Sequence, residues 1–221
     1  MTIPTDIHTH RQPQVPGEAI INCFPETFDP QAEGWYSVGV HPWHATTFSA
    51  ASPLSSLPSS LSLSELEQML HHPRVLAVGE AGLDKLAAAP LSLQVTIFES
   101  QALLAEESGK PLIIHLVKTV DELLKLKRRL RPAVPWIIHG FRGKAALAEE
   151  YLRHGFHLSF GERYQEAALR MVSPERLFLE TDEATTPISL LYERAAEVRG
   201  VSSEKLEETI RRNVSEIFFK R

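Results

Sequence analysis

The chain has 221 residues, 43% apolar and 23% charged, a composition that can bury a sizeable core and excludes general disorder. A formal net charge of −5 excludes a general affinity for polyanions, so any contact with nucleic acid requires a local cationic patch. The single cysteine, Cys23, excludes an internal disulfide and a thiolate zinc cluster. Because neither an apolar leader nor a run of about 18 apolar residues is present, we expect a cytoplasmic domain over residues 1–221, without membrane contact.

Eight short apolar runs bounded by turn residues predict strands along the chain. Helical periodicity follows the later runs, at residues 91–108, 120–130, 144–154 and 162–171. Strands that alternate with helices predict a parallel sheet, and eight of them predict an α/β fold of the (β/α)8, TIM-like barrel type. In chain order the runs are IPTDIHTH, AIINCF, WYSVGVHP, VLAVGEAGLD, PLIIHL, PWIIHGF, FHLSF and RLFLETD.

The front of the chain departs from this alternation. Only eight residues, 11–18, separate the first two predicted strands, and about ten separate the second from the third. Since a crossover helix does not fit there, we expect no regular outer helix after the first two strands. The Ser-, Leu- and Pro-rich residues 48–64 predict a loop before a helix at about 65–71, and the sequence leaves open whether this loop is an active-site lid or a surface insertion. Residues 203–219 predict a final amphipathic helix capped by Ser203.

Metal-binding residue types recur at the ends of the predicted strands. His8 and His10 are two residues apart, so on a strand both imidazoles point to one face and can hold one cation. Histidines and carboxylates also end four later strands, and the strands of a barrel converge at that end. We therefore expect these side chains to form a divalent-metal site. The later residues are Glu80, His115, His139 and Asp182.

The ordered set DIHTH, GVHPWH, VGEAGLD, IIH, IHGFRG and LETD, with the ending NVSEIF, resembles the TatD family of amidohydrolase-type metallohydrolases. The resemblance spans nearly the whole chain. It implies a barrel hydrolase with one or two divalent metals, commonly acting on phosphodiester bonds in DNA. It also implies roles for the six residues: His8, His10 and Asp182 hold the first metal, Glu80 bridges two metals, and His115 with His139 holds the second. Glu80 and Asp182 are then the expected catalytic carboxylates, with Asp182 accepting a proton from the nucleophilic water.

The residues expected to contact substrate depart from the family pattern. Val117 stands where members of the family often carry an arginine, so the remaining cations near the mouth are Lys85, Lys118 and Arg142. His41, in GVHPWH, is either a substrate contact or part of a shaped turn.

Three functions stay open at this point. The leading one is hydrolysis of phosphoester bonds, either in DNA, as by a deoxyribonuclease, or in a small phosphoester. The second is hydrolysis of amide, lactone or cyclic amidine bonds, and the third is a non-catalytic metal-binding barrel. Imidazole and carboxylate ligands suit Zn, Mn, Co or Ni, while four histidines argue against a site made only for Mg. The sequence does not determine the oligomeric state.

Overall fold

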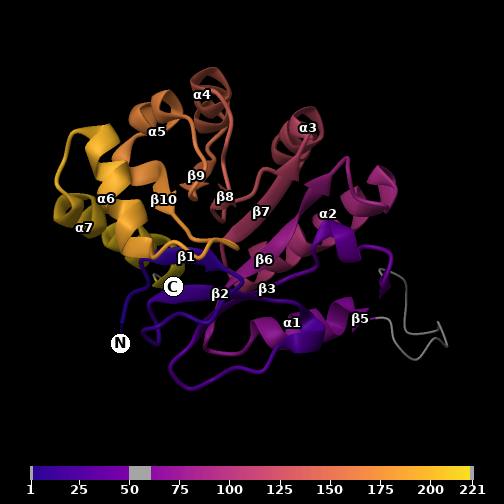
Figure 1. Ribbon diagram of the computed structural model, residues 1–221. Helices are drawn as coiled ribbons and strands as arrows, with labels where there is room; N and C mark the ends of the chain where they lie inside the picture. The colour runs from indigo at the N-terminus through magenta and orange to yellow at the C-terminus, as the bar shows by residue number, and fades with distance from the viewer. Residues whose placement is uncertain (1, 50–60, 220–221) are drawn as a thin grey trace. The chain divides into compact units, whose positions relative to one another are not determined.

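The computed structural model describes residues 2–49 and 61–219 (Figure 1). The chain divides into two compact units. The first unit contains Met1–Ile21, Ala32–Trp35 and Trp136–Arg221. The second contains Asn22–Gln31 and Tyr36–Pro135. That residues 1–221 form a single domain stays a prediction.

The first unit is built on parallel strands. β1 pairs with β2, β9 pairs with both β8 and β10, and a bridge between Thr9 and Asp182 joins β1 to the residues after β10. The order is therefore β2-β1-β10-β9-β8, which brings the first and last strands of the chain side by side. The strands are β1 (Asp6–Thr9), β2 (Ala19–Cys23, of which the first three residues belong here), β8 (Trp136–Ile138), β9 (His157–Phe160) and β10 (Leu177–Leu179).

Helices follow the later strands of this unit, and Trp136, Phe160 and Phe178 of these strands are fully buried. Two expectations need correction. The helix expected from residue 162 begins at Glu166, and the last helix is capped by Ser202, whose side chain accepts from the backbone N–H of Lys205. The elements are α4 (Ala145–Arg153), α5 (Glu166–Met171), η3 (Pro174–Arg176), α6 (Ile188–Arg199), α7 (Ser203–Val214) and the π-helical turn η4 (Ser215–Phe219).

The main sheet of the second unit has three parallel strands in the order β3-β6-β7, and β4 pairs with β5 separately. The helix α2 packs on β6, and two buried glutamines of α2 anchor the loops that follow the strands. Gln101 bonds the backbone N–H and carbonyl of Val40 at 2.7 and 3.1 Å, and Gln94 does the same for Asp84 at 2.8 and 3.0 Å. The elements are η1 (Pro25–Thr27), β3 (Trp35–Val38), η2 (Pro42–His44), β4 (Phe48–Ser49), β5 (Leu61–Ser62), α1 (Leu63–Leu70), β6 (Val75–Asp84), α2 (Leu91–Ser108), β7 (Leu112–Val117) and α3 (Val120–Leu130).

Strands β6 and β7 approach each other closely at Gly82. This glycine pairs with His115, and a Cβ on it would lie 2.0 Å from the His115 carbonyl oxygen. No residue with a side chain fits there without separating the strands. The close approach sets the neighbouring side chains of β6 against His115.

All eight predicted strands are present. Among the described residues, no α-helix lies between β1 and β2 or between β2 and β3, so the expected reduction of the outer helices is confirmed. The predicted loop at 48–64 is interrupted by β4, β5 and the start of α1. The lid interpretation concerns mainly residues 50–60, which lie outside the described residues. Within the described chain, none of the helices has the length and apolar character to cross a membrane.

Candidate metal centre

His8, His10 and Asp182 are brought together in the first unit by the pairing of its first and last strands. The backbone N–H of Asp182 donates to the His8 carbonyl at 2.9 Å, and the N–H of His10 donates to the Asp182 carbonyl at 3.0 Å. Asp182 has a φ of +55°, a left-handed conformation that aspartate tolerates better than most residues. Its Oδ1 lies 3.9 Å from His8 Nε2 and 3.7 Å from His10 Nε2.

This group fits a divalent cation. The three ligand atoms lie within 4.8 Å of one another. Two ligands on one tetrahedral ion, with bonds of about 2.0–2.2 Å, are roughly 3.3–3.6 Å apart, so the observed spacings exceed this by only a few tenths of an ångström. Two imidazoles and a carboxylate are donors that suit transition metals.

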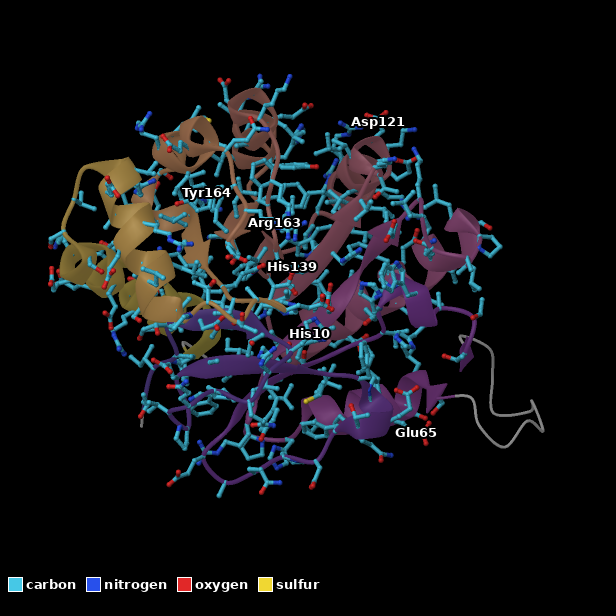
Figure 2. All side chains as sticks on the ribbon, in the orientation of Figure 1. His10, Glu65, Asp121, His139, Arg163 and Tyr164 are labelled. Atoms are coloured by element: carbon cyan, nitrogen blue, oxygen red, sulfur yellow. The ribbon has the colours of Figure 1, made fainter. Side chains whose placement is uncertain are left out.

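His139 and Glu180 lie beside this group in the same unit. His10 and His139 are both labelled in Figure 2. The ring centroids of His8 and His139 are 4.3 Å apart. Glu180 is fully buried, accepts from the Gly140 N–H at 2.6 Å, and lies 3.2 Å from His139 Nδ1. Burial opposes ionisation of Glu180, but His139 and His8 outweigh it and hold the pKa of this carboxyl below its usual value. Glu180 was not among the predicted ligands, although it precedes Asp182 by two residues at the end of β10.

Asp6 ties β1 to the residue before Asp182. Its carboxyl accepts from the Thr181 hydroxyl at 2.6 Å, the Thr181 N–H at 3.1 Å and the His8 N–H at 3.2 Å. Burial raises the pKa of Asp6 to about 7, although these hydrogen bonds lower it. The contacts fix the backbone on both sides of the first group.

A second group lies along β6 in the second unit, where Glu80 is within the strand and not at its end as expected. His115 Nδ1 is 2.9 Å from Glu80 Oε1, and its Nε2 is 3.2 Å from Asp84 Oδ2. His41 Nε2 lies 3.4 Å from the same Glu80 oxygen. Glu80, His41 and His115 offer ligand atoms within 4.8 Å of one another, so this group also fits a cation.

Asp84 and His41 have larger parts in this second group than the sequence suggested. Burial opposes ionisation of Asp84, but hydrogen bonds from the Leu86 N–H, the Trp43 indole and His115 hold its pKa below the usual value. His41 Nδ1 accepts from the Trp43 N–H at 3.1 Å, so the predicted shaped turn is confirmed. Its buried Nε2 also makes it a candidate ligand. For both residues the available signal was their place at the end of a strand.

The three basic residues that were predicted to contact substrate lie in three different surroundings. Arg142 Nη2 lies 4.0 Å from Asp182 Oδ2, beside the first group. Lys85 pairs with Glu122 of α3 at 3.3 Å. Lys118 is exposed at the end of β7, with a φ of +56°. Their contacts with substrate stay predictions.

The six predicted ligands therefore divide between the units. His8, His10 and Asp182 come together in the first unit, where His139 joins them, and Glu80 meets His115 in the second. The bridging role of Glu80 and the pairing of His115 with His139 stay predictions.

Comparisons with known proteins identify relatives of this chain. The chain is 28% identical to the uncharacterized metal-dependent hydrolase YabD of Bacillus subtilis over 178 residues, which cover 71% of this chain and 70% of YabD. It is 30% identical over 159 residues to the 3'-5' ssDNA/RNA exonuclease TatD of Musicola paradisiaca, covering 67% of this chain and 56% of that protein. It is 31% identical over 160 residues to the human 3'-5' RNA nuclease TATDN2, covering 67% of this chain and 20% of that protein. The chain thus spans about half the length, or less, of these two nucleases.

The fold is also shared with solved structures. YjjV, a TatD homologue from Escherichia coli, matches over 100% of both chains with a TM-score of 0.80 and 20% identity. A TatD family hydrolase from Entamoeba histolytica matches 85% of this chain and 75% of its own, with a TM-score of 0.68 and 16% identity. The predicted TIM-like (β/α)8 fold of the metallohydrolase type is thereby confirmed. Since the family model described as TatD related DNase matches residues 26–219, the chain belongs to the TatD family.

Proposed function

We propose that this chain is a divalent-metal-dependent hydrolase of phosphoester bonds, acting on single-stranded nucleic acid or on a small phosphoester. The observation that carries the proposal is the first group, in which two imidazoles and a carboxylate converge at 3.7 and 3.9 Å. Relatives named as ssDNA/RNA and RNA nucleases belong to the same family and support the choice of phosphoester bonds.

The residues of the first group would share the chemistry. A divalent cation, when bound, polarises the phosphoryl group and acidifies a water molecule. His8 and His10 would hold this cation from β1, with Asp182 as the third ligand. Asp182 Oδ2 lies near the Arg142 guanidinium, so the carboxylate accepts a proton from water close to a positive charge that can bind a phosphoryl oxygen. Glu180 holds His139 in a fixed orientation and is too deeply buried to contact substrate itself.

The second group would hold a further cation through His41, Glu80 and His115. Asp84 accepts from the Trp43 indole and orients His115 from its other nitrogen. Nitrogen and carboxylate donors in both groups favour Zn, Mn, Co or Ni over Mg alone. A cytoplasmic location remains a prediction from the sequence.

A substrate panel tests the proposal. Metal-free protein is loaded separately with Mn, Zn, Co and Ni, and is assayed on a single-stranded oligonucleotide, a small phosphodiester, an amide and a lactone. We expect phosphoester hydrolysis that requires metal, and activity on the oligonucleotide should weaken with added salt. The His10→Ala variant is the control for activity from a contaminant. Turnover of the amide or lactone with none of either phosphoester contradicts the proposal.

A further inference from the structure

Trp43 is an exposed aromatic residue with a fixed orientation. It lies in η2, and 64% of its surface is accessible. Its indole N–H donates to Asp84 Oδ2 at 2.7 Å, and its backbone N–H donates to His41 Nδ1 at 3.1 Å. An exposed tryptophan usually samples several rotamers, but the bond to an ionised carboxylate restrains this ring. Trp43 therefore presents a pre-oriented apolar surface to solvent.

The support beneath the ring is the second metal-binding group. Asp84 holds the Trp43 indole, lies 3.2 Å from His115 Nε2, and accepts from the Leu86 N–H at 2.7 Å. Leu86 is itself 67% exposed, so one buried carboxylate holds both the Trp43 ring and the backbone of a second exposed apolar residue. Gln94 fixes the backbone of Asp84 on both sides. The platform and the second group consequently share a single rigid support.

We propose that Trp43 is the stacking platform for one nucleobase of a single-stranded nucleic acid substrate, an inference that rests on the proposed function. Every base has a flat face that stacks on an aromatic ring, so such a platform binds without regard to sequence. The Trp43 ring is hydrogen-bonded to Asp84, and Asp84 contacts the candidate ligand His115. A base stacked on this ring would therefore bring its own phosphate to the second group.

The charge of the chain makes such a contact useful. With a net charge of −5 and with Lys85 paired to Glu122, the protein offers few cations to the phosphates near the second group. Stacking supplies affinity that does not depend on charge and that varies little with salt. An extended protein partner, by contrast, would need a larger apolar patch than Trp43 and Leu86 provide.

The test compares an oligothymidylate with an abasic oligonucleotide of equal length and charge. Binding is measured by fluorescence anisotropy in EDTA, and kcat/KM is measured with the metal-loaded enzyme. The parental protein should favour the thymidine oligonucleotide about 10-fold, or ~1.4 kcal/mol, in at least one of the two assays. Trp43→Ala should lose this preference, while Trp43→Phe, which keeps an aromatic face, should retain part of it. Leu103→Ala removes a similarly exposed apolar side chain from α2 and should leave the preference unchanged.

The outcomes separate this inference from the proposed function. A Trp43→Ala variant with the parental preference overturns the stacking role while leaving nuclease activity in place. A parental protein that binds both oligonucleotides equally and also hydrolyses both equally does the same. A parental protein that neither binds nor hydrolyses any phosphoester overturns both proposals.

Discussion

Replacing Gly82 with alanine tests whether the close approach of β6 and β7 builds the second metal-binding group. The added Cβ would lie 2.0 Å from the His115 carbonyl oxygen, about 1.4 Å short of an ordinary contact at 3.4 Å. The strands must separate, which weakens the ladder hydrogen bonds on either side of the pair. Two buried hydrogen bonds left unsatisfied cost about 1–3 kcal/mol each, so we expect a loss of roughly 4 kcal/mol in the free energy of unfolding. That is a large part of the ~5–15 kcal/mol typical of a domain.

The assay is urea unfolding of the metal-free protein, followed by elemental analysis of the metal-loaded protein. Gly161→Ala is the matched control, because a Cβ there would meet its nearest atom, the Glu180 carbonyl oxygen, at 3.7 Å. Gly82→Ala should also bind one fewer cation, since His115 moves away from Glu80. If the two variants unfold within about 1 kcal/mol of each other and hold equal metal, the reasoning about this strand pair is wrong.

Three further predictions concern single side chains. His10→Ala should bind one fewer cation by elemental analysis. Because the His10 side chain is 26% exposed, the unfolding free energy of the metal-free variant should change by less than about 1 kcal/mol. Unchanged metal content would show that His10 is not a ligand. Glu80→Gln keeps the shape but loses the charge, so kcat should fall roughly 100-fold with little change in stability, and a variant with parental turnover would show that the carboxylate is dispensable. Burial raises the pKa of Cys23 to about 11 from 9.0, so the thiol stays neutral at pH 8. Its alkylation by iodoacetamide should be about 100-fold slower than that of an ordinary thiol and should accelerate as pH rises toward 11. Rapid alkylation at pH 8 would contradict the raised pKa.

The strands and much of the metal-binding set could be predicted because both leave local signals. A buried strand is a short apolar run, and a histidine at its end is visible in the same few residues. Spacing also placed His8 and His10 on one face before any partner was known. Local patterning likewise predicted α2 and α3 with the bounds they have in the structure.

The remaining parts depend on contacts between distant residues. The pairing of Glu180 with His139 spans 41 residues, and that of Asp84 with His115 spans 31, so neither leaves a local pattern. The helix α6 was missed for a different reason. Its buried residues recur at helical spacing, but Ala195 and Ala196 contribute little to an apolar signal. His41 was ambiguous because the same side chain both caps a turn and faces Glu80.

The pairing of Thr9 with Asp182 has a consequence for how the protein acquires its metal. The first group joins residues about 170 positions apart, so it cannot exist in a nascent chain until the segment after β10 has been synthesised and docked on β1. Closing so long a loop is slow and entropically costly, and a cation that binds only the closed form offsets part of that cost. Metal should therefore slow unfolding and protect both ends of the chain from proteolysis together. The ion would then stabilise the fold in addition to its part in catalysis.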